Sequence, residues 1–142
     1  MKIVKASSKN IDEIVNVEAN CGYHKNPVKT ELKKLFVDFF NLTHPYAYVL
    51  KDNNKIIGYF AFRKIRRDCE LDYIAIIHRY QGKGLAKLSL NKLILLCKKS
   101  NINKINLSVR NSNKKAINLY KKYGFKTVNK SKNKFFMVKE LK

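Results

Sequence analysis

Near the middle of the sequence, a glycine-rich turn separates an apolar segment from an amphipathic one. The apolar segment, residues 73–77, has the composition of a strand, and the amphipathic segment, 85–99, has that of a helix. Between them, Gly82 and Gly84 allow the backbone to approach a ligand closely. The N–H groups of a helix's first turn and the helix dipole both favour negative charge. The turn is therefore predicted to bind an anion, and a pyrophosphate fits this description.

The glycine spacing excludes two common nucleotide motifs. The dinucleotide motif G-x-G-x-x-G needs a third glycine, and the P-loop does not place a lysine such as Lys83 between its glycines. What is present is Gln81-x-x-Gly84-x-Ala86. Further along stands N-x-x-A-x-x-L-Y-x-x-x-G-F, which spans residues 113–125. The second pattern is long enough to be specific, and it follows a predicted strand.

Together these motifs resemble those of the GNAT superfamily, the general-control-related N-acetyltransferases, over nearly the full length of the chain. The first resembles the acetyl-coenzyme A motif (Q/R)-x-x-G-x-(G/A), and the second is most similar to that of the ribosomal-protein N-terminal acetyltransferases. The resemblance implies an α/β (α+β) fold with a mixed sheet of about seven strands and about four helices. It also implies acetyl-CoA as co-substrate, no metal, and direct attack of an amine on the thioester.

The resemblance also assigns cofactor-binding residues. Acetyl-CoA would enter a V-shaped gap between the fourth and fifth strands, with its pantetheine arm beside Asn113 and its sulfur beside Tyr120. The backbone of Ile74, Ala75 and Ile76 would pair with this arm, and the Ile76 N–H would stabilise the oxyanion. The pyrophosphate would contact the turn and the start of the helix, formed by Gln81, Gly82, Lys83, Gly84, Leu85, Ala86 and Lys87.

The reaction also needs a general acid for the leaving thiolate and a general base for the amine. Tyr120 suits the acid that protonates the leaving thiolate, and its alternative is an aromatic residue on the core side of its helix. The ribosomal-protein enzymes have a glutamate base twelve positions before this tyrosine, where this chain has Ser108. Glu70 and Asp72, on one side of the fourth strand, are the predicted bases. The alternative is that both are counter-charges to the many lysines.

The elements that must position these groups are predicted in the order β, α, α, β, β, β, α, β, α, β, β. Period-two and helical patterns predict strands and helices, and the last two strands form a hairpin around a loop at 129–134. The remaining strands are predicted at 2–6, 46–51, 55–65, 70–77 and 102–109, and the helices end near residues 21, 41, 99 and 124. Residues 1–142 are predicted to form a single domain, with no linker or repeat.

Composition narrows the class of protein. No apolar run approaches the ~20 residues that cross a bilayer, and the N-terminus lacks an apolar signal core, so a cytoplasmic protein is predicted. The three cysteines, Cys21, Cys69 and Cys97, are odd in number and widely spaced. We therefore expect neither a disulfide framework nor a zinc site. Cys97 is predicted to lie in the core, on the apolar side of its helix.

The net charge is +21, from 31 basic and 10 acidic residues. One interpretation is an acidic partner, such as the ribosome or a nucleic acid. The other is a solvated basic surface, because the lysines are spread over nearly every segment. In either case a positive field steers the phosphates of CoA towards the protein.

The sequence thus favours an acetyl-CoA-dependent N-acetyltransferase that acts on a protein N-terminal amine or a lysine. Two alternatives stay open: an enzyme for small-molecule amines, and a RNA-associated binding module that has kept the fold. The predicted acceptor loops, 23–28 and 129–134, are short and basic and lack carboxylates that would hold a polycation, which favours a protein acceptor. Either a monomer or a dimer is compatible with the sequence.

Overall fold

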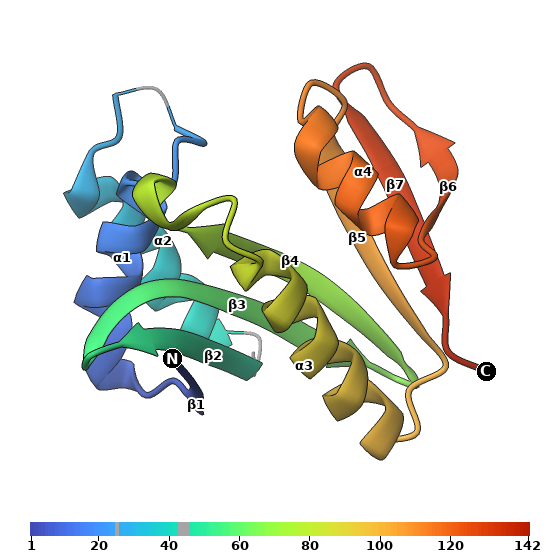
Figure 1. Ribbon diagram of the computed structural model, residues 1–142, viewed down its shortest axis with the longest axis horizontal. Coiled ribbons are helices and arrows are strands. Elements are labelled where there is room, and N and C mark those ends of the chain that lie inside the picture. The colour runs from blue at the N-terminus through green and yellow to red at the C-terminus, as the bar shows by residue number, and fades with distance from the viewer. Residues whose placement is uncertain (25, 43–45) are drawn as a thin grey trace.

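A single mixed sheet with helices on both faces organises the chain (Figure 1). The computed structural model describes residues 1–24, 26–42 and 46–142, without the side chains of 39–42. Within these ranges the sheet has seven strands and is accompanied by four α-helices, as predicted. The strands are β1 (Lys2–Lys5), β2 (Tyr46–Asp52), β3 (Lys55–Ile65), β4 (Asp68–Ile76), β5 (Lys104–Arg110), β6 (Lys126–Lys130) and β7 (Lys134–Glu140).

The helices follow the predicted order between these strands. They are α1 (Ile11–Ala19), α2 (Lys29–Leu42), α3 (Leu85–Lys99) and α4 (Lys114–Lys122), with short 3-10 helices η1 (Ser8–Asn10) and η2 (His78–Tyr80). In the described ranges no helix is long and apolar enough to span a membrane.

The sheet splits where its one parallel pair ends. The strand order is β1-β2-β3-β4-β5-β7-β6, and β4 and β5 pair in parallel only from Asp68 opposite Lys104 to Leu71 opposite Leu107. Beyond these residues β4 pairs with β3 alone and β5 pairs with β7 alone. The two strands therefore diverge, and a gap opens between the halves of the sheet (Figure 1).

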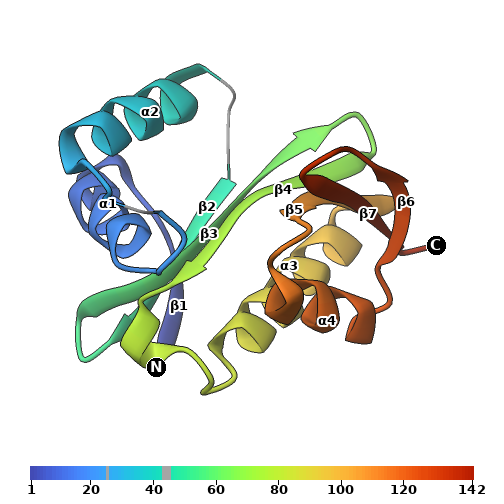
Figure 2. The same cartoon turned by 90° about the horizontal axis from the view of Figure 1, so that it is seen from above.

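Helices from the N-terminal and C-terminal halves of the chain cover opposite faces of the sheet. α1 and α2 pack on one face, and α3 lies on the other (Figure 2). α3 buries Leu90, Leu93 and Cys97, whose spacing places them on one helical stripe, so the prediction that Cys97 belongs to the core is confirmed. Full burial of a side chain the size of leucine stabilises the fold by about 1.5–3 kcal/mol. This packing holds the start of α3 beside the gap.

Some predicted boundaries were wrong, and two of them lie in segments rich in polar residues. β4 begins at Asp68, because Cys69 and Leu71 are buried although neighbouring polar residues interrupt the apolar run. The loop predicted at 129–134 is shorter, since β6 runs to Lys130 and pairs there with Phe135 of β7. An edge strand exposes most of its side chains, so lysine and asparagine are tolerated in it.

Candidate active site

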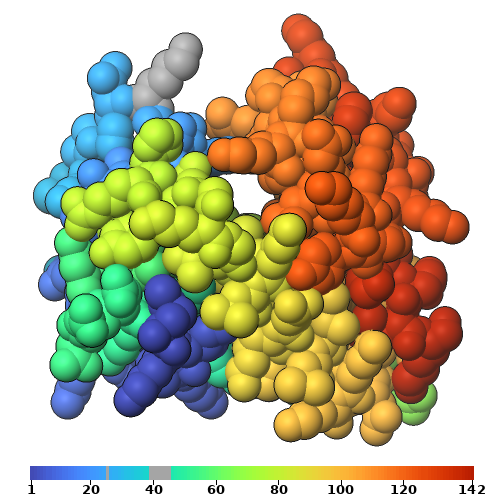
Figure 3. Space-filling view, viewed as in Figure 1, coloured from blue at the N-terminus to red at the C-terminus, as the bar shows by residue number. Residues whose placement is uncertain are grey.

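The divergence of β4 from β5 opens a cavity of about 1220 Å³ between the two halves of the molecule. Figure 3 shows it as a hollow between the N-terminal and C-terminal halves. The cavity has two sides. The side that we call the α3 side is lined by the glycine-rich turn and α4, and the side that we call the α1/α2 side is lined by the segment after α1, by α2 and by β4. All the predicted site residues except Glu70 and Lys83 line this cavity.

The glycine-rich turn presents backbone donors on the α3 side of the cavity. Gly82 and Gly84 have φ angles of +78° and +81°, a left-handed conformation that favours glycine. The first backbone bond of α3 runs from the Leu88 N–H to the Gly84 carbonyl at 3.0 Å. The N–H groups of residues 85–87 precede this hydrogen-bond ladder, so they are free to bind an anion. The ammonium of Lys83 lies over the Tyr80 ring, 5.3 Å from its centroid, instead of lining the cavity.

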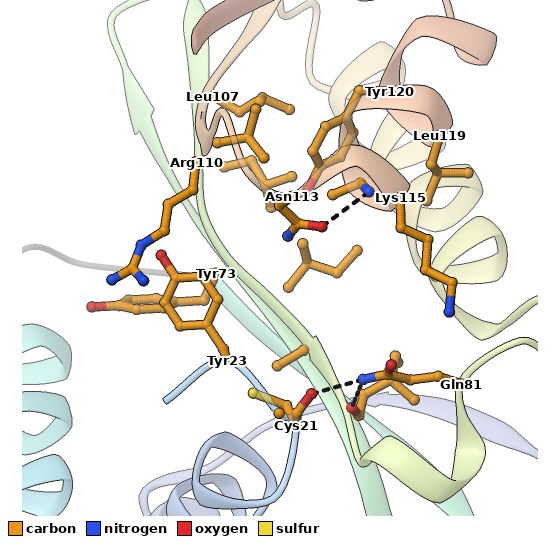
Figure 4. A pocket seen from close by; sticks show the side chains of 18 of the residues that line it. Cys21, Tyr23, Tyr73, Gln81, Leu107, Arg110, Asn113, Lys115, Leu119 and Tyr120 are labelled. Atoms are coloured by element: carbon orange, nitrogen blue, oxygen red, sulfur yellow. Dashed lines mark hydrogen bonds between the residues drawn. The ribbon is translucent and has the colours of Figure 1, made fainter. Parts of the chain in front are cut away.

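Gln81 fixes the position of this turn. Its Nε2 donates to the carbonyl of Cys21 at 2.8 Å and to that of Ile76 at 2.9 Å (Figure 4). Both amide donors are thus used within the protein. The side chain lines the cavity, but its hydrogen bonds join the turn to β4 and to the segment after α1. We therefore assign Gln81 a positioning role beside its predicted place in the cofactor site.

On the edge of β4 along the gap, Ile74 and Ile76 have no strand partner among the described residues. The Ile77 N–H donates to the Ile57 carbonyl of β3 at 2.9 Å. Successive residues of a strand direct their N–H groups to opposite edges, so the Ile76 N–H, and likewise that of Ile74, point to the gap. Ala75 directs its backbone to β3, opposite Tyr59, and lines the cavity with its side chain. The predicted oxyanion donor is thus suitably oriented.

Tyr120 brings a protonated phenol to the cavity. The side chain is 6% exposed, and burial raises its pKa to about 12, so the hydroxyl keeps its proton at neutral pH. In the described part of the chain this hydroxyl has no hydrogen-bond partner, and in Figure 4 it points towards Asn113. The Asn113 side chain caps α4 by accepting a bond from the Ala116 N–H at 3.2 Å. This cap fixes the start of the helix that carries Tyr120.

The two predicted bases, Asp72 and Glu70, have different surroundings. Asp72 occupies an extra position of β4, because Ala61 pairs with Tyr73 while Phe62 pairs with Leu71. Its two carboxylate oxygens accept hydrogen bonds from Arg63, at 2.7 Å from Nε and 2.9 Å from Nη2.

The hydrogen bond that Arg63 donates to Asp72 raises the pKa of the guanidinium, which therefore stays charged. Glu70 lies in the paired part of β4, between Arg63 of β3 and Asn106 of β5, and does not line the cavity. Ser108, at the position of the glutamate in the ribosomal-protein enzymes, does line it.

A cluster on the α1/α2 side, in which two of the three residues are buried, was missed by the sequence analysis. Glu18, at 6% exposure, accepts a hydrogen bond from the Tyr59 hydroxyl at 2.7 Å, and its other oxygen contacts His24 Nε2. Both Glu18 and His24 line the cavity. The three residues come from α1, from β3 and from the segment before α2. No spacing in the sequence joins them, so no short motif could have indicated them.

A cation–π contact also links the two halves of the molecule across the cavity. The guanidinium of Arg110, at the end of β5, lies 4.5 Å from the centroid of the Tyr23 ring (Figure 4). A cation over an aromatic face is attracted by about 0.5–2 kcal/mol, depending on its desolvation. Within the described residues, no group of three or more histidine, cysteine or acidic side chains is placed to hold a metal ion.

Comparison with known proteins places this arrangement in a family. The profile of the Acetyltransferase (GNAT) family matches residues 11–125. The ribosomal protein bS18-alanine N-acetyltransferase of Haemophilus influenzae is 40% identical over 84 residues, which are 59% of this chain and 57% of that relative. The aligned part of this chain thus spans little more than half the length of that curated relative.

Solved structures share the fold over almost the whole chain. The ribosomal-protein-S18-alanine N-acetyltransferase from Escherichia coli has a TM-score of 0.85 at 20% identity, covering 99% of this chain and 93% of that one. PaiA N-acetyltransferase from Thermoplasma acidophilum, solved in complex with coenzyme A, has a TM-score of 0.82 at 21% identity and covers 98% of both chains. The family profile covers most of the sequence and the fold agrees with it, so the chain belongs to the acetyltransferase (GNAT) family.

Proposed function

We propose that this protein is an acetyl-CoA-dependent N-acetyltransferase that modifies a primary amine of a protein, either an N-terminal amine or a lysine. One observation carries this proposal. The cavity at the split between β4 and β5 is lined both by a turn with free backbone N–H donors and by the phenol of Tyr120. A long cofactor with an anionic end and a reactive thioester end matches these two features.

The residues on the α3 side fit acetyl-CoA. When bound, acetyl-CoA supplies an activated acetyl thioester. The N–H groups of residues 85–87 would bind its pyrophosphate, and the unpaired edge of β4 at Ile74 and Ile76 would pair with its pantetheine arm. The Ile76 N–H would stabilise the oxyanion, and Tyr120 would protonate the departing sulfur. The coenzyme A complex of the Thermoplasma relative supports this assignment.

The α1/α2 side would receive the amine, and its charges favour a protein over a polyamine. A polyamine site needs carboxylates that are free to pair with the ligand's ammonium groups. The described acidic residues that line the cavity are Glu18 and Asp72, and each is already bonded within the protein. The names of the Haemophilus and Escherichia relatives, which modify a ribosomal protein, also support a protein acceptor.

The same names support a cytoplasmic protein that meets a ribosomal protein or the ribosome itself. The net charge of +21 would favour such an acidic partner. Weaker binding of this partner at raised salt would identify the electrostatic contribution to the affinity, because surface charges are screened over about 8–10 Å at physiological ionic strength.

Two measurements test the proposed function. Isothermal titration with acetyl-CoA is expected to show saturable binding, and a silent titration would favour a binding module without cofactor. A mass-spectrometric screen should then offer peptide N-termini, internal lysines and polyamines to the protein with acetyl-CoA. We expect acetylated peptides; acetylation of polyamines alone would replace the protein acceptor with a small-molecule one.

A further inference from the structure

The Glu18 carboxylate is fixed at both oxygens on the α1/α2 side of the cavity. Oε1 accepts from the Tyr59 hydroxyl at 2.7 Å, and Oε2 contacts His24 Nε2. Burial raises the pKa of Tyr59 well above its usual value, so its hydroxyl remains a donor. A buried carboxylate is costly unless its oxygens are hydrogen-bonded, and both oxygens of Glu18 have partners.

His24 is the more accessible member of this pair. Its side chain is 30% exposed and lines the cavity, whereas that of Glu18 is 8% exposed. Nε2 is directed at the carboxylate, and the second ring nitrogen, Nδ1, has no hydrogen-bond partner among the described residues, so it can exchange a proton with a ligand or water. The Tyr23 ring meets the imidazole edge-on, at 5.2 Å between centroids. The imidazole is therefore held by contacts on two sides.

Most groups packed around the pair are neutral, and the guanidinium of Arg110 lies 4.5 Å from the centroid of the Tyr23 ring, on which the imidazole packs. Tyr59 comes from β3 and Tyr73 from β4, and Cys21 lies beside Glu18 in the segment after α1. Burial raises the pKa of each of these groups, and nearby carboxylates add to the rise (Asp72 and Glu18 for Tyr73, Glu18 for the other two), so all three are neutral at pH 7. α2 contributes the buried Phe36, 5.9 Å from the Tyr59 ring. Among these described neighbours, Glu18 is the charge nearest to His24.

The other described proton acceptors are less suitable. Asp72 is bonded at both oxygens by Arg63, Glu70 does not line the cavity, and Ser108 is a hydroxyl. His78, the other described histidine of the cavity wall, lies in η2 and is exposed. It has no carboxylate partner in the described residues.

We infer that His24 is the general base of the acetyl transfer and that Glu18 is the residue that positions it. This inference rests on the proposed function, because it needs an amine acceptor on the α1/α2 side. A carboxylate that accepts one ring N–H fixes the tautomer and the orientation of an imidazole.

The proton balance of the step is complete. An acceptor ammonium loses one proton to His24 Nδ1, and the lone pair that is freed forms the C–N bond to the acetyl carbon. A second proton leaves the nitrogen as the C–S bond breaks and the sulfur takes the phenol proton of Tyr120. One of the two nitrogen protons returns to Tyr120 through water, and the other is released to solvent. No oxidant or further reactant is required.

The test compares His24→Gln and Glu18→Gln with the wild type, using the peptide found in the screen. The pH profile of kcat/KM is expected to rise through an acidic limb as His24 loses its proton. His24→Gln should lose at least about tenfold in kcat and lack this limb, since general bases typically contribute ~10²–10⁴-fold. Glu18→Gln should keep the limb but lower kcat, because the amide no longer fixes the tautomer and orientation of the imidazole.

Three controls separate this inference from simpler explanations. Glu13→Gln removes an exposed carboxylate from the same helix and should leave the profile unchanged. Circular dichroism and acetyl-CoA titration of the His24 and Glu18 variants should match the wild type, which separates loss of the base from loss of the fold or of cofactor binding. Added imidazole should restore part of the activity of His24→Ala, which a purely structural role would not allow.

Two results would overturn the inference, and a third would overturn the proposed function on which it rests. An unchanged acidic limb in a folded His24→Gln variant would exclude His24 as the base. A limb that disappears in His78→Gln instead would transfer the role to that histidine. Absence of acetyl-CoA binding in the wild type would instead contradict the proposed function itself.

Discussion

The two sides of the cavity are built in different ways. On the α3 side, the proposed anion-binding turn is one contiguous segment, residues 81–87, and it would act through backbone N–H groups. On the α1/α2 side, the cluster uses side chains from separate elements, and Glu18 and Tyr59 are 41 positions apart. The first arrangement requires particular residues at fixed spacing, such as glycines with positive φ. The second requires only that the fold bring the side chains together.

This difference predicts how each side responds to mutation. A backbone site is damaged by any side chain that strains or blocks the turn, largely irrespective of its chemistry. A side-chain cluster is damaged by loss of one functional group, even when the shape is kept. The variants below, from the largest expected effect to the smallest, test whether the two sides can be separated in this way.

Gly84→Asp should have the largest effect, on acetyl-CoA affinity. The residue has a φ of +81°, which costs an L-residue about 1–2 kcal/mol, and the new carboxylate would face the pyrophosphate. We expect affinity to fall by at least about tenfold, or 1.4 kcal/mol. Gly84→Ala is the matched control, since its Cβ would meet nothing within 4 Å and adds strain without charge. Equal affinities for wild type and a folded Gly84→Asp would remove the turn from the cofactor site.

Tyr120→Phe should lower kcat while leaving acetyl-CoA affinity largely intact. The phenol acts only as the sulfur leaves, so a loss of at least about tenfold is expected in kcat. Because its pKa is raised to about 12, the wild-type phenol keeps its proton as pH rises, and Tyr120 should add no alkaline limb below pH 10. Tyr46→Phe, in β2, is the control. Unchanged kcat where chemistry limits the rate would reduce Tyr120 to a packing role.

Most of the fold follows from local patterns in the sequence. The β5 side chains of Ile105, Leu107 and Val109 alternate as a half-buried strand should, and they are buried. Asn113 and Gly124 mark the two ends of α4 through capping chemistry. Each of these signals lies within one element, so no knowledge of the tertiary structure is needed to interpret it.

The acceptor side could not be predicted in this way. Glu18 looks like another polar residue in α1, and only the structure shows that it is buried against Tyr59. The reverse holds for Asp72, whose place on β4 suggested a base. The extra residue in β4 brings it against Arg63, and this pairing depends on the register of two strands. Charge and position in the sequence do not determine which carboxylates are already paired.

Asp72→Asn should act on stability more than on the pH dependence of catalysis. It leaves the guanidinium of Arg63, whose side chain is 31% exposed, without its bidentate partner. After screening by solvent, we expect a loss of about 1–2 kcal/mol in the free energy of unfolding, measured by urea denaturation. Asp68→Asn is the control, because its 4.0 Å contact with Lys104 is more exposed and should contribute little. A changed acidic limb in Asp72→Asn, with stability unaltered, would make Asp72 the base.

Glu70→Gln should have the smallest effect and is the sharpest test of the comparison. The sequence predicts Glu70 as a base, but the residue lies in the paired part of β4, below the point at which β5 diverges, and does not line the cavity. An amine in the cavity could reach it only through a chain of waters. We therefore expect the loss in kcat/KM to stay well below about tenfold, with the acidic limb unchanged. If the rate instead falls at neutral pH and recovers as pH rises, Glu70 is the base. The acceptor side would then, like the cofactor side, be readable from one strand of the sequence, and the difference between the two sides would disappear.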